Sequence, residues 1–251
     1  MQFFKFSLSI LLAAGLLSCN KDKDDTPPTD TGKAVPEVFQ KVYGATSITS
    51  DGQYVYIKTN GEPDHKSIYF PEGDSRYENF SGTTFAGNTF HKNPNTIMAK
   101  YYTFKIPINP AMDVTHRPTP LGPIGVALNG VPFFNQYAGP NQPLNNEMES
   151  FDQYWGHPAP AGDYHYHVEP LYLTMVKTSR SALMGFLLDG YPVYGPEENG
   201  AEVLESDLDE FHGHFGVTAD YPDGIYHYHV TATDPFINGS GFYGTPGTVT
   251  Q

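Results

Sequence analysis

The chain has one cysteine, few basic residues and no apolar run long enough to cross a membrane comfortably. Its 251 residues include 14 Lys and Arg against 28 Asp and Glu, a formal net charge of −14 at pH 7. Cys19 has no second cysteine for a disulfide within the chain. Because nucleic-acid phosphates require a basic protein face, this charge balance argues against nucleic acid as a partner.

The first 37 residues differ in composition from the rest. A positive residue, Lys5, precedes an apolar stretch over 8–17, which predicts a signal peptide over residues 1–18. The sequence Leu-Leu-Ser-Cys at 16–19 resembles a bacterial lipobox, so we expect Cys19 to be acylated. Residues 19–37 are acidic and then rich in Pro and Thr, which predicts a flexible tether. We expect an outer-membrane lipoprotein of the bacterial cell envelope, anchored to the membrane by lipid. The acidic run behind Cys19 is typical of lipoproteins that are exported to the cell surface.

Three sequence blocks occur twice, in the same order. Residues 125–134 match 185–194, residues 151–157 match 208–214, and Tyr-His-Tyr-His-Val at 164–168 recurs at 226–230. A repeat of this length indicates duplication of a supersecondary unit, and two copies are too few for a solenoid. We therefore predict one domain over 38–251 with internal repeats near 124–168 and 184–230.

The local pattern predicts short strands. Asn129-Gly130 and Asp189-Gly190 lie between apolar runs and favour two-residue hairpins with type I′ turns. Residues 46–59 predict another hairpin, and 206–212 is the best helix candidate. We expect a mainly β, sandwich-like domain of two pseudo-repeated units with few short helices. The repeats leave open whether they pair in one sheet or form two halves of a sandwich.

Seven of the ten histidines lie in the repeats. On a strand, residues i and i+2 share a face with Cα atoms about 6.5 Å apart, so two imidazoles can reach one ion. Adding the Gly-His block gives three histidines per repeat, and three neutral imidazoles suit Zn, Cu or Fe. The predicted ligands are His157, His165, His167, His214, His227 and His229. Two separate sites and one shared site both remain open.

Other recurring polar residues are candidates for extra ligands or for groups that orient an imidazole ring. The carboxylates of Asp152 and Asp209 occupy matching positions in the two repeats. Asp189 lies in the second hairpin, and His212 stands where the first repeat has Trp155. Structural roles in turns and strands explain the same residues without a metal.

Several motifs together resemble the YHYH-domain family. They are the two Tyr-His-Tyr-His motifs, Leu-Asn-Gly-Val-Pro at 128–132, Leu-Asp-Gly-Tyr-Pro at 188–192 and Asn-Gly-Glu-Pro-Asp-His at 60–65. The resemblance covers roughly residues 46–244. It implies a secreted or envelope-associated protein and adds His65 to the candidates, but it implies no reaction and no catalytic residue.

Three functions fit these features. The favoured hypothesis is a lipid-anchored envelope protein that binds a divalent transition metal for capture or structure. An alternative is a metal-dependent hydrolase or oxidoreductase with Asp152, Asp209 or Glu210 as base. The third is a metal-free surface module that binds a protein or glycan partner through Tyr and Phe.

Overall fold

The computed structural model describes residues 32–239 and 241–251. The predicted signal peptide, Cys19 and the tether up to residue 31 lie outside the described residues. Within the described ranges, no helix has the length and apolar character needed to cross a membrane.

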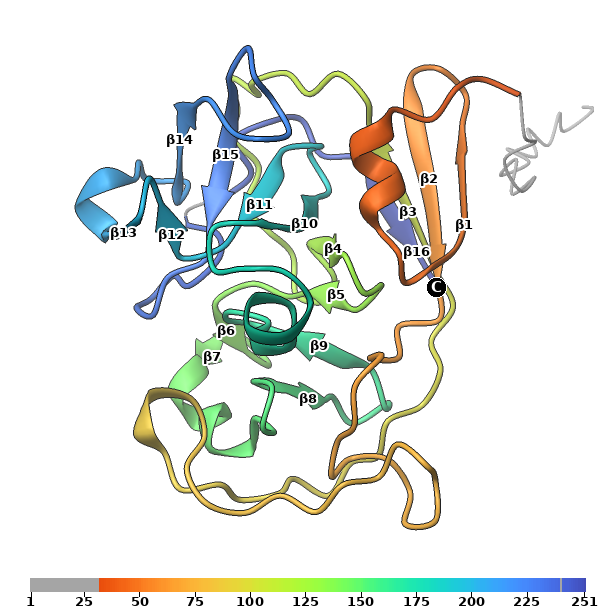
Figure 1. Cartoon of the computed structure of the whole chain (residues 1–251), viewed down its shortest axis with the longest axis vertical. Helices are drawn as coiled ribbons and strands as arrows, with labels where there is room; N and C mark the ends of the chain where they lie inside the picture. Colours follow the sequence, from red (N-terminus) through yellow and green to blue (C-terminus); the bar gives the residue numbers. More distant parts are fainter. Residues whose placement is uncertain (1–31, 240) are drawn as a thin grey trace, which may run out of the picture.

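The two repeats form a single eight-stranded sheet (Figure 1). Its strand order is β14-β15-β11-β10-β4-β5-β9-β8, so from the middle outward both halves follow the same plan. Each half places a hairpin at the centre, the Tyr-His-Tyr-His strand parallel to it, and an antiparallel edge strand outside. The first half contains β4 (Gly125–Ala127), β5 (Pro132–Phe133), β8 (Gly156–Pro158) and β9 (Tyr164–Tyr166). The second contains β10 (Leu183–Leu187), β11 (Pro192–Tyr194), β14 (Gly213–Gly216) and β15 (Ile225–His229).

The halves meet about a pseudo-twofold axis between β4 and β10. Val126 pairs with Phe186, the residue at its own position in the other repeat. On one side of this pair Gly125 pairs with Leu187, and on the other side Gly185 pairs with Ala127. The pseudo-twofold axis exchanges these two pairs, because 125 matches 185 and 127 matches 187 in the repeats. Duplication therefore produced two units that pair with each other across the centre of one sheet.

Glycine is required on both sides of this axis. A Cβ on Gly125 would lie 2.4 Å from the carbonyl oxygen of Phe186, and one on Gly185 would lie 2.2 Å from that of Val126. Real Cβ atoms do not approach backbone oxygen so closely. The duplicated glycine thus permits the close approach of the two central strands.

Both predicted hairpins are confirmed, but their turns are not type I′. In the first, the amide of Gly130 donates to the carbonyl of Ala127 at 2.9 Å, and Gly190 makes the same bond to Leu187 at 3.0 Å. The φ angle is +82° at Gly130 and +91° at Gly190. The residue before each glycine, Asn129 or Asp189, does not have a positive φ angle. A type I′ turn needs two consecutive positive φ angles, and here the glycine alone supplies one.

A second sheet and two small hairpins contain the other strands of the described residues. The second sheet has the order β1-β2-β3-β16 and is antiparallel throughout. Its strands are β1 (Ala45–Ser50), β2 (Tyr54–Thr59), β3 (Tyr102–Pro107) and β16 (Thr248–Thr250). The β1–β2 pair confirms the hairpin predicted over 46–59. The small hairpins are β6 (Tyr137–Ala138) with β7 (Gln142–Pro143), and β12 (Glu197–Glu198) with β13 (Ala201–Glu202).

Helical segments are short. They are η1 (Glu37–Lys41), η2 (Phe85–Gly87), η3 (Leu144–Asn146), η4 (Met148–Ser150), η5 (Leu173–Lys177) and η6 (Glu205–Asp207). The helix predicted over 206–212 is largely wrong, because only its first two residues belong to η6. His212 has a φ of +72°, which directs the chain into β14 instead of continuing a helix.

One hydrophobic cluster joins the two larger sheets. It includes Ile57 of β2 and Phe104 of β3 together with Val126 and Phe186 at the centre of the large sheet. The ring of Phe39, on η1, contacts that of Phe186 with centroids 4.4 Å apart. The predicted mainly β fold of two repeated units with few short helices is therefore confirmed.

Candidate metal centres

The strands β9 and β15 have an imidazole face and a tyrosine face. Because successive side chains alternate, His165 points away from its neighbours Tyr164 and Tyr166. The same alternation separates His227 and His229 from Tyr228. All of these side chains are buried. The pleat of one strand therefore separates the candidate metal ligands of each motif from its tyrosines.

The first triplet consists of His157, His165 and His167. The edge strand β8 places His157 directly opposite His165 in the ladder with β9. The Nε2 atom of His165 lies 3.1 Å from that of His157 and 2.9 Å from that of His167. Three imidazole nitrogens, from β8, from β9 and from the residue that follows β9, thus converge on one point.

Hydrogen bonds determine the tautomers of two of these rings. The Nδ1 atom of His165 is 2.8 Å from the carbonyl oxygen of Asp163, and that of His167 is 2.6 Å from the carbonyl oxygen of Asn135. A carbonyl only accepts, so each Nδ1 must carry the hydrogen. The Nε2 atoms of both neutral rings are consequently unprotonated, and their lone pairs face each other.

In the third ring, that of His157, a serine hydroxyl takes the place of the main-chain carbonyl. The hydroxyl of Ser150 donates to the carbonyl oxygen of Glu147 at 2.7 Å. Its oxygen is 2.6 Å from Nδ1 of His157 and therefore accepts the hydrogen of that ring. All three Nε2 atoms of the first triplet then present lone pairs to the same point with no hydrogen between them.

The second triplet consists of His214, His227 and His229. The ladder of β14 with β15 places His214 opposite His227. The Nε2 atom of His214 is 3.1 Å from that of His227 and 3.2 Å from that of His229. Because β14 and β8 are opposite edges of the large sheet, the repeats build two separate centres.

The ring-orienting carbonyls are also duplicated. The Nδ1 atom of His227 lies 3.0 Å from the carbonyl oxygen of Ile225, and that of His229 lies 2.8 Å from that of Gly195. These positions match Asp163 and Asn135 in the first repeat. Since the contacts are made by main-chain oxygens, the side-chain identities at 135, 163, 195 and 225 gave the sequence analysis no signal.

Burial favours the neutral form of five of the six imidazoles. Desolvation lowers the pKa of His165 to about 4 and that of His229 to about 4. Desolvation also lowers the pKa of His227. For His157 and His167, desolvation and electrostatic repulsion from the neighbouring imidazoles together lower the pKa well below the usual range. Neutral rings with free Nε2 lone pairs are the form that binds a transition metal.

Each triplet has a glutamate beside it that sequence reasoning missed. Glu198, on β12, has one carboxylate oxygen 3.5 Å from Nε2 of His214 and the other 3.5 Å from Nε2 of His227. Glu147, between η3 and η4, has an oxygen 3.6 Å from Nε2 of His157 and 4.0 Å from that of His167. Desolvation raises the pKa of Glu147.

These two acids do not occupy matching positions in the repeats. The hairpins β6–β7 and β12–β13 follow β5 and β11 in the same place, and the residue that matches Glu198 is Ala138. The first repeat instead brings Glu147 from a later segment. Extending the repeat past residue 194 would have reached the second hairpin, but no spacing rule would have found Glu147.

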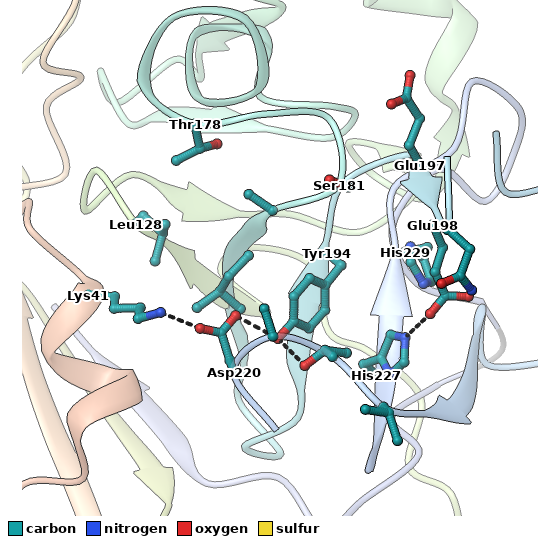
Figure 2. Close-up of a pocket in the computed structure, with 16 residues that line it drawn as sticks. Lys41, Leu128, Thr178, Ser181, Tyr194, Glu197, Glu198, Asp220, His227 and His229 are labelled. Carbon is teal, nitrogen blue, oxygen red and sulfur yellow. Dashed lines mark hydrogen bonds and ion pairs between the residues drawn. The ribbon is translucent and has the colours of Figure 1, made fainter. Parts of the chain in front are cut away.

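Both centres open onto cavities. The first triplet lines a cavity of about 550 Å³, together with Glu147 and Phe134. His227 and His229 line a second cavity of about 380 Å³, shown in Figure 2. In that view Glu198 lies beside the imidazoles, and Tyr194, whose ring centroid is 5.2 Å from that of His227, extends its hydroxyl toward Asp220.

The tyrosine faces bind the recurring acids. Tyr164 donates to Asp152 at 2.9 Å, and its counterpart Tyr226 donates to Asp209 at 2.8 Å. Asp189 accepts from Tyr228 at 2.6 Å. The three carboxylates therefore lie on the tyrosine side of the strands, away from the imidazoles. This position assigns them to holding the strands and not to the two triplets.

The other histidines lie outside both triplets. The Nε2 atom of His65 is 3.1 Å from the hydroxyl of Tyr166, which again is the tyrosine face. His212 contacts Thr231 through Nε2 at 3.0 Å. His91 is exposed beside Glu149, and His116 stacks on the ring of Phe211. Of the candidates, the six histidines of the repeated triplets are the ones that the fold brings together.

The geometry of each triplet suits a metal ion. Zn–N bonds of 2.0–2.1 Å in a tetrahedron place the nitrogens about 3.3 Å apart. The Nε2 pairs described above lie 2.9–3.2 Å apart, close to that separation. Three imidazoles with a nearby carboxylate are donors for Zn, Cu or Fe, so these groups can hold such an ion.

The comparisons with known proteins give one match. The family model described as YHYH protein matches residues 103–203 and 198–241, which include both Tyr-His-Tyr-His motifs. Neither the comparison with curated proteins nor that with solved structures found a match. On a match that spans more than half of the sequence and both histidine triplets, the chain belongs to the YHYH protein family.

Proposed function

We propose that the protein binds a divalent transition metal ion of the Zn, Cu or Fe type at each of its two histidine triplets. The supporting observation is the set of three unprotonated Nε2 atoms in the first triplet, each with its Nδ1 hydrogen already donated elsewhere. Without a cation, lone pairs 2.9–3.1 Å apart in a buried site repel one another. A bound ion converts this repulsion into three coordinate bonds.

Metal capture or a structural metal is the role that this arrangement supports best. Each set of ligands comes from two paired strands, with His167 directly after β9, so an ion is not needed to assemble it. The rings are oriented by main-chain carbonyls, which raises their basicity and fixes their direction. Such a preformed site binds its ion with little reorganisation.

A metal-dependent hydrolase or oxidoreductase is the second candidate, favoured by the first cavity. It has a volume of about 550 Å³ and contains Glu147 beside the triplet. A bound ion would supply Lewis acidity. Glu147 would take the place that Asp152 and Asp209 have in the sequence-based hypothesis, since it lies on the imidazole side.

The metal-free interaction module has less support. It requires an exposed aromatic stripe and imidazoles whose nitrogens are all satisfied. The four tyrosines of the repeated motifs are at most 2% exposed. The Nε2 atoms of the first triplet face one another without a hydrogen, so the second requirement also lacks support.

We propose in addition that the chain is anchored in the bacterial envelope by acyl chains on Cys19. The support is the lipobox-like sequence at 16–19 and the polar tether behind it. More than one acyl chain gives stable anchoring. In a bacterial host, labelled fatty acid should enter the wild type and not a Cys19→Ala variant. A wild type that stays unlabelled would contradict the anchor.

Metal analysis of the purified full-length chain, made without a histidine tag, tests the metal proposal. Elemental mass spectrometry should find about two transition-metal ions per chain. A variant with His165, His167, His227 and His229 changed to Ala should lose them while keeping its near-UV circular dichroism. His91→Ala is the matched control, because His91 is exposed and lies outside both triplets. A wild type that stays metal-free after incubation with Zn, Cu and Fe salts would refute the proposal.

A further inference from the structure

The acids cover the two triplets to different extents. Glu198 has a carboxylate oxygen that lies with all three imidazole nitrogens of its triplet in one compact group, every pair within 4.8 Å. Glu147 is outside the corresponding group of the first triplet and approaches His157 and His167. An ion held by the first triplet would therefore be less covered by its acid, and a ligand from the cavity could complete its coordination.

Apolar side chains line one side of the first cavity beside His165, although Asn93, Asn95 and Glu149 line it elsewhere. The ring of Phe134 stacks on that of His165 with centroids 3.9 Å apart and planes at 18°. Leu121 is 46% exposed and Tyr137 is 42% exposed, and both line the cavity. Apolar side chains that remain in water beside a metal position can be covered by the apolar body of a ligand.

The second cavity has a polar wall at the matching place. Tyr194 occupies the position of Phe134, and its hydroxyl contacts Thr218 at 2.7 Å and donates to Asp220 at 2.8 Å. Asp220 also pairs with Lys41 (Figure 2). The same strand position therefore presents an apolar ring at one centre and a hydrogen-bonded network at the other.

From this difference we infer that the first cavity is a binding site for an organic ligand with an oxygen-donor head group and a flat apolar body. The head group, of the carboxylate or hydroxamate kind, completes the coordination of the first ion, and the body lies between Phe134 and Leu121. The second centre does not take this ligand, because Glu198 lies over its triplet. This inference rests on the proposed metal binding.

Cobalt and two hydroxamates test it without an activity assay. Co(II) is added to the metal-free His227→Ala/His229→Ala variant, which keeps the first triplet, and to the His165→Ala/His167→Ala variant, which keeps the second. Acetohydroxamate and benzohydroxamate are titrated while the visible cobalt spectrum is recorded. At the first centre benzohydroxamate should bind roughly tenfold more tightly than acetohydroxamate, because its phenyl group is buried. At the second centre the spectrum should change only at concentrations at least tenfold higher.

A wall variant tests where the apolar body lies. Leu121→Ala should reduce the preference for benzohydroxamate about threefold or more, whereas Leu204→Ala, an exposed leucine that lines neither cavity, should leave it unchanged. Equal binding of the two hydroxamates, or an unchanged preference in Leu121→Ala, would overturn the ligand inference while cobalt binding stands. A first triplet that takes up no cobalt would overturn the proposed function itself.

Discussion

The two halves of the large sheet share a backbone plan and a histidine triplet but differ in the acid and the cavity wall beside the triplet. Strand order, hairpin turns, ring-orienting carbonyls and Tyr–Asp hydrogen bonds recur at matching positions. The acid does not recur, because Ala138 stands at the position of Glu198, and the cavity wall changes from Phe134 to Tyr194. The strands therefore give both triplets the same ligand geometry. The loops and one wall residue determine which acid and which cavity lining each triplet has beside it.

The largest expected effect separates the two centres. His165→Ala/His167→Ala should lose one ion of two, and His227→Ala/His229→Ala should lose the other, because each pair removes two of three imidazole ligands. Elemental analysis of both variants beside the wild type measures this. If either pair abolished all metal binding, the centres would be coupled or shared, and the description of two independent sites would fail.

The stability of the metal-free protein should depend on pH. The folded pKa is about 4 for His165 and about 4 for His229, below the usual value of 6.5. Between these values the unfolded chain binds more protons, so stability is complete above pH 6.5 and falls as pH drops toward 4. The loss is about 1.4 kcal/mol per pH unit for each titrating imidazole.

Urea unfolding of chelator-treated protein at several pH values measures this slope. A His165→Gln/His229→Gln variant provides the control, since it removes two of the titrating rings and should flatten the curve. A metal-free wild type equally stable at pH 4 and pH 7 would contradict the burial of neutral imidazoles.

Substitutions at the pseudo-twofold axis compare the two halves directly. Gly125→Ala and Gly185→Ala each place a methyl group against a backbone oxygen, and each should cost about 3 kcal/mol of unfolding free energy. Urea unfolding of both variants checks the magnitude. Losses that differ by more than about 1 kcal/mol would show that the central strands are not energetically equivalent.

The two glutamates should differ in their contribution to metal affinity. Glu198→Gln should weaken the second centre about 10- to 100-fold, because its carboxylate lies with all three imidazoles. Glu147→Gln should weaken the first centre only about threefold. Competition with a coloured chelator, carried out in the two single-centre variants, gives both affinities. Similar losses at the two centres would remove the distinction between a covered and an open triplet.

A further expected effect concerns the tyrosine faces. Tyr228 donates to the buried carboxylate of Asp189, whose pKa burial raises to about 6, while its counterpart Tyr166 contacts the amide of Asn129 at 3.0 Å. Hydrogen bonds to charged groups contribute more, so Tyr228→Phe should cost about 2 kcal/mol and Tyr166→Phe about 1 kcal/mol. Thermal unfolding at pH 7 compares them. A larger loss in Tyr166→Phe would reverse the assignment of the stronger bond.

Much of this could be predicted from the repeats. Strand alternation placed His165 and His167 on one face, and the recurring Gly-His block supplied His157, because these relations are local in the chain. The residues around the triplets could not be predicted. Asn135 acts through its main-chain oxygen, and Glu147 reaches the first triplet through loop packing that leaves no periodic pattern.

The predictions about carboxylates show the same limit. Asp152 and Asp209 recur beside the histidines in sequence, yet they bind the tyrosines on the other side of the strands. A repeat shows that two residues have equivalent positions, but it does not show which face of the sheet they approach. Side chains that come from a turn acquire their direction from tertiary packing.

By itself the sequence determined the mainly β class, the duplication, the hairpins and the six imidazoles, since strand periodicity, turn chemistry and repeated order are local properties. Only the tertiary structure decided that the repeats pair across β4 and β10 in one sheet. That pairing puts the triplets at opposite edges, where two centres form instead of one. It also decided which acid and which wall each centre receives, because contacts between distant segments depend on packing and not on chain order.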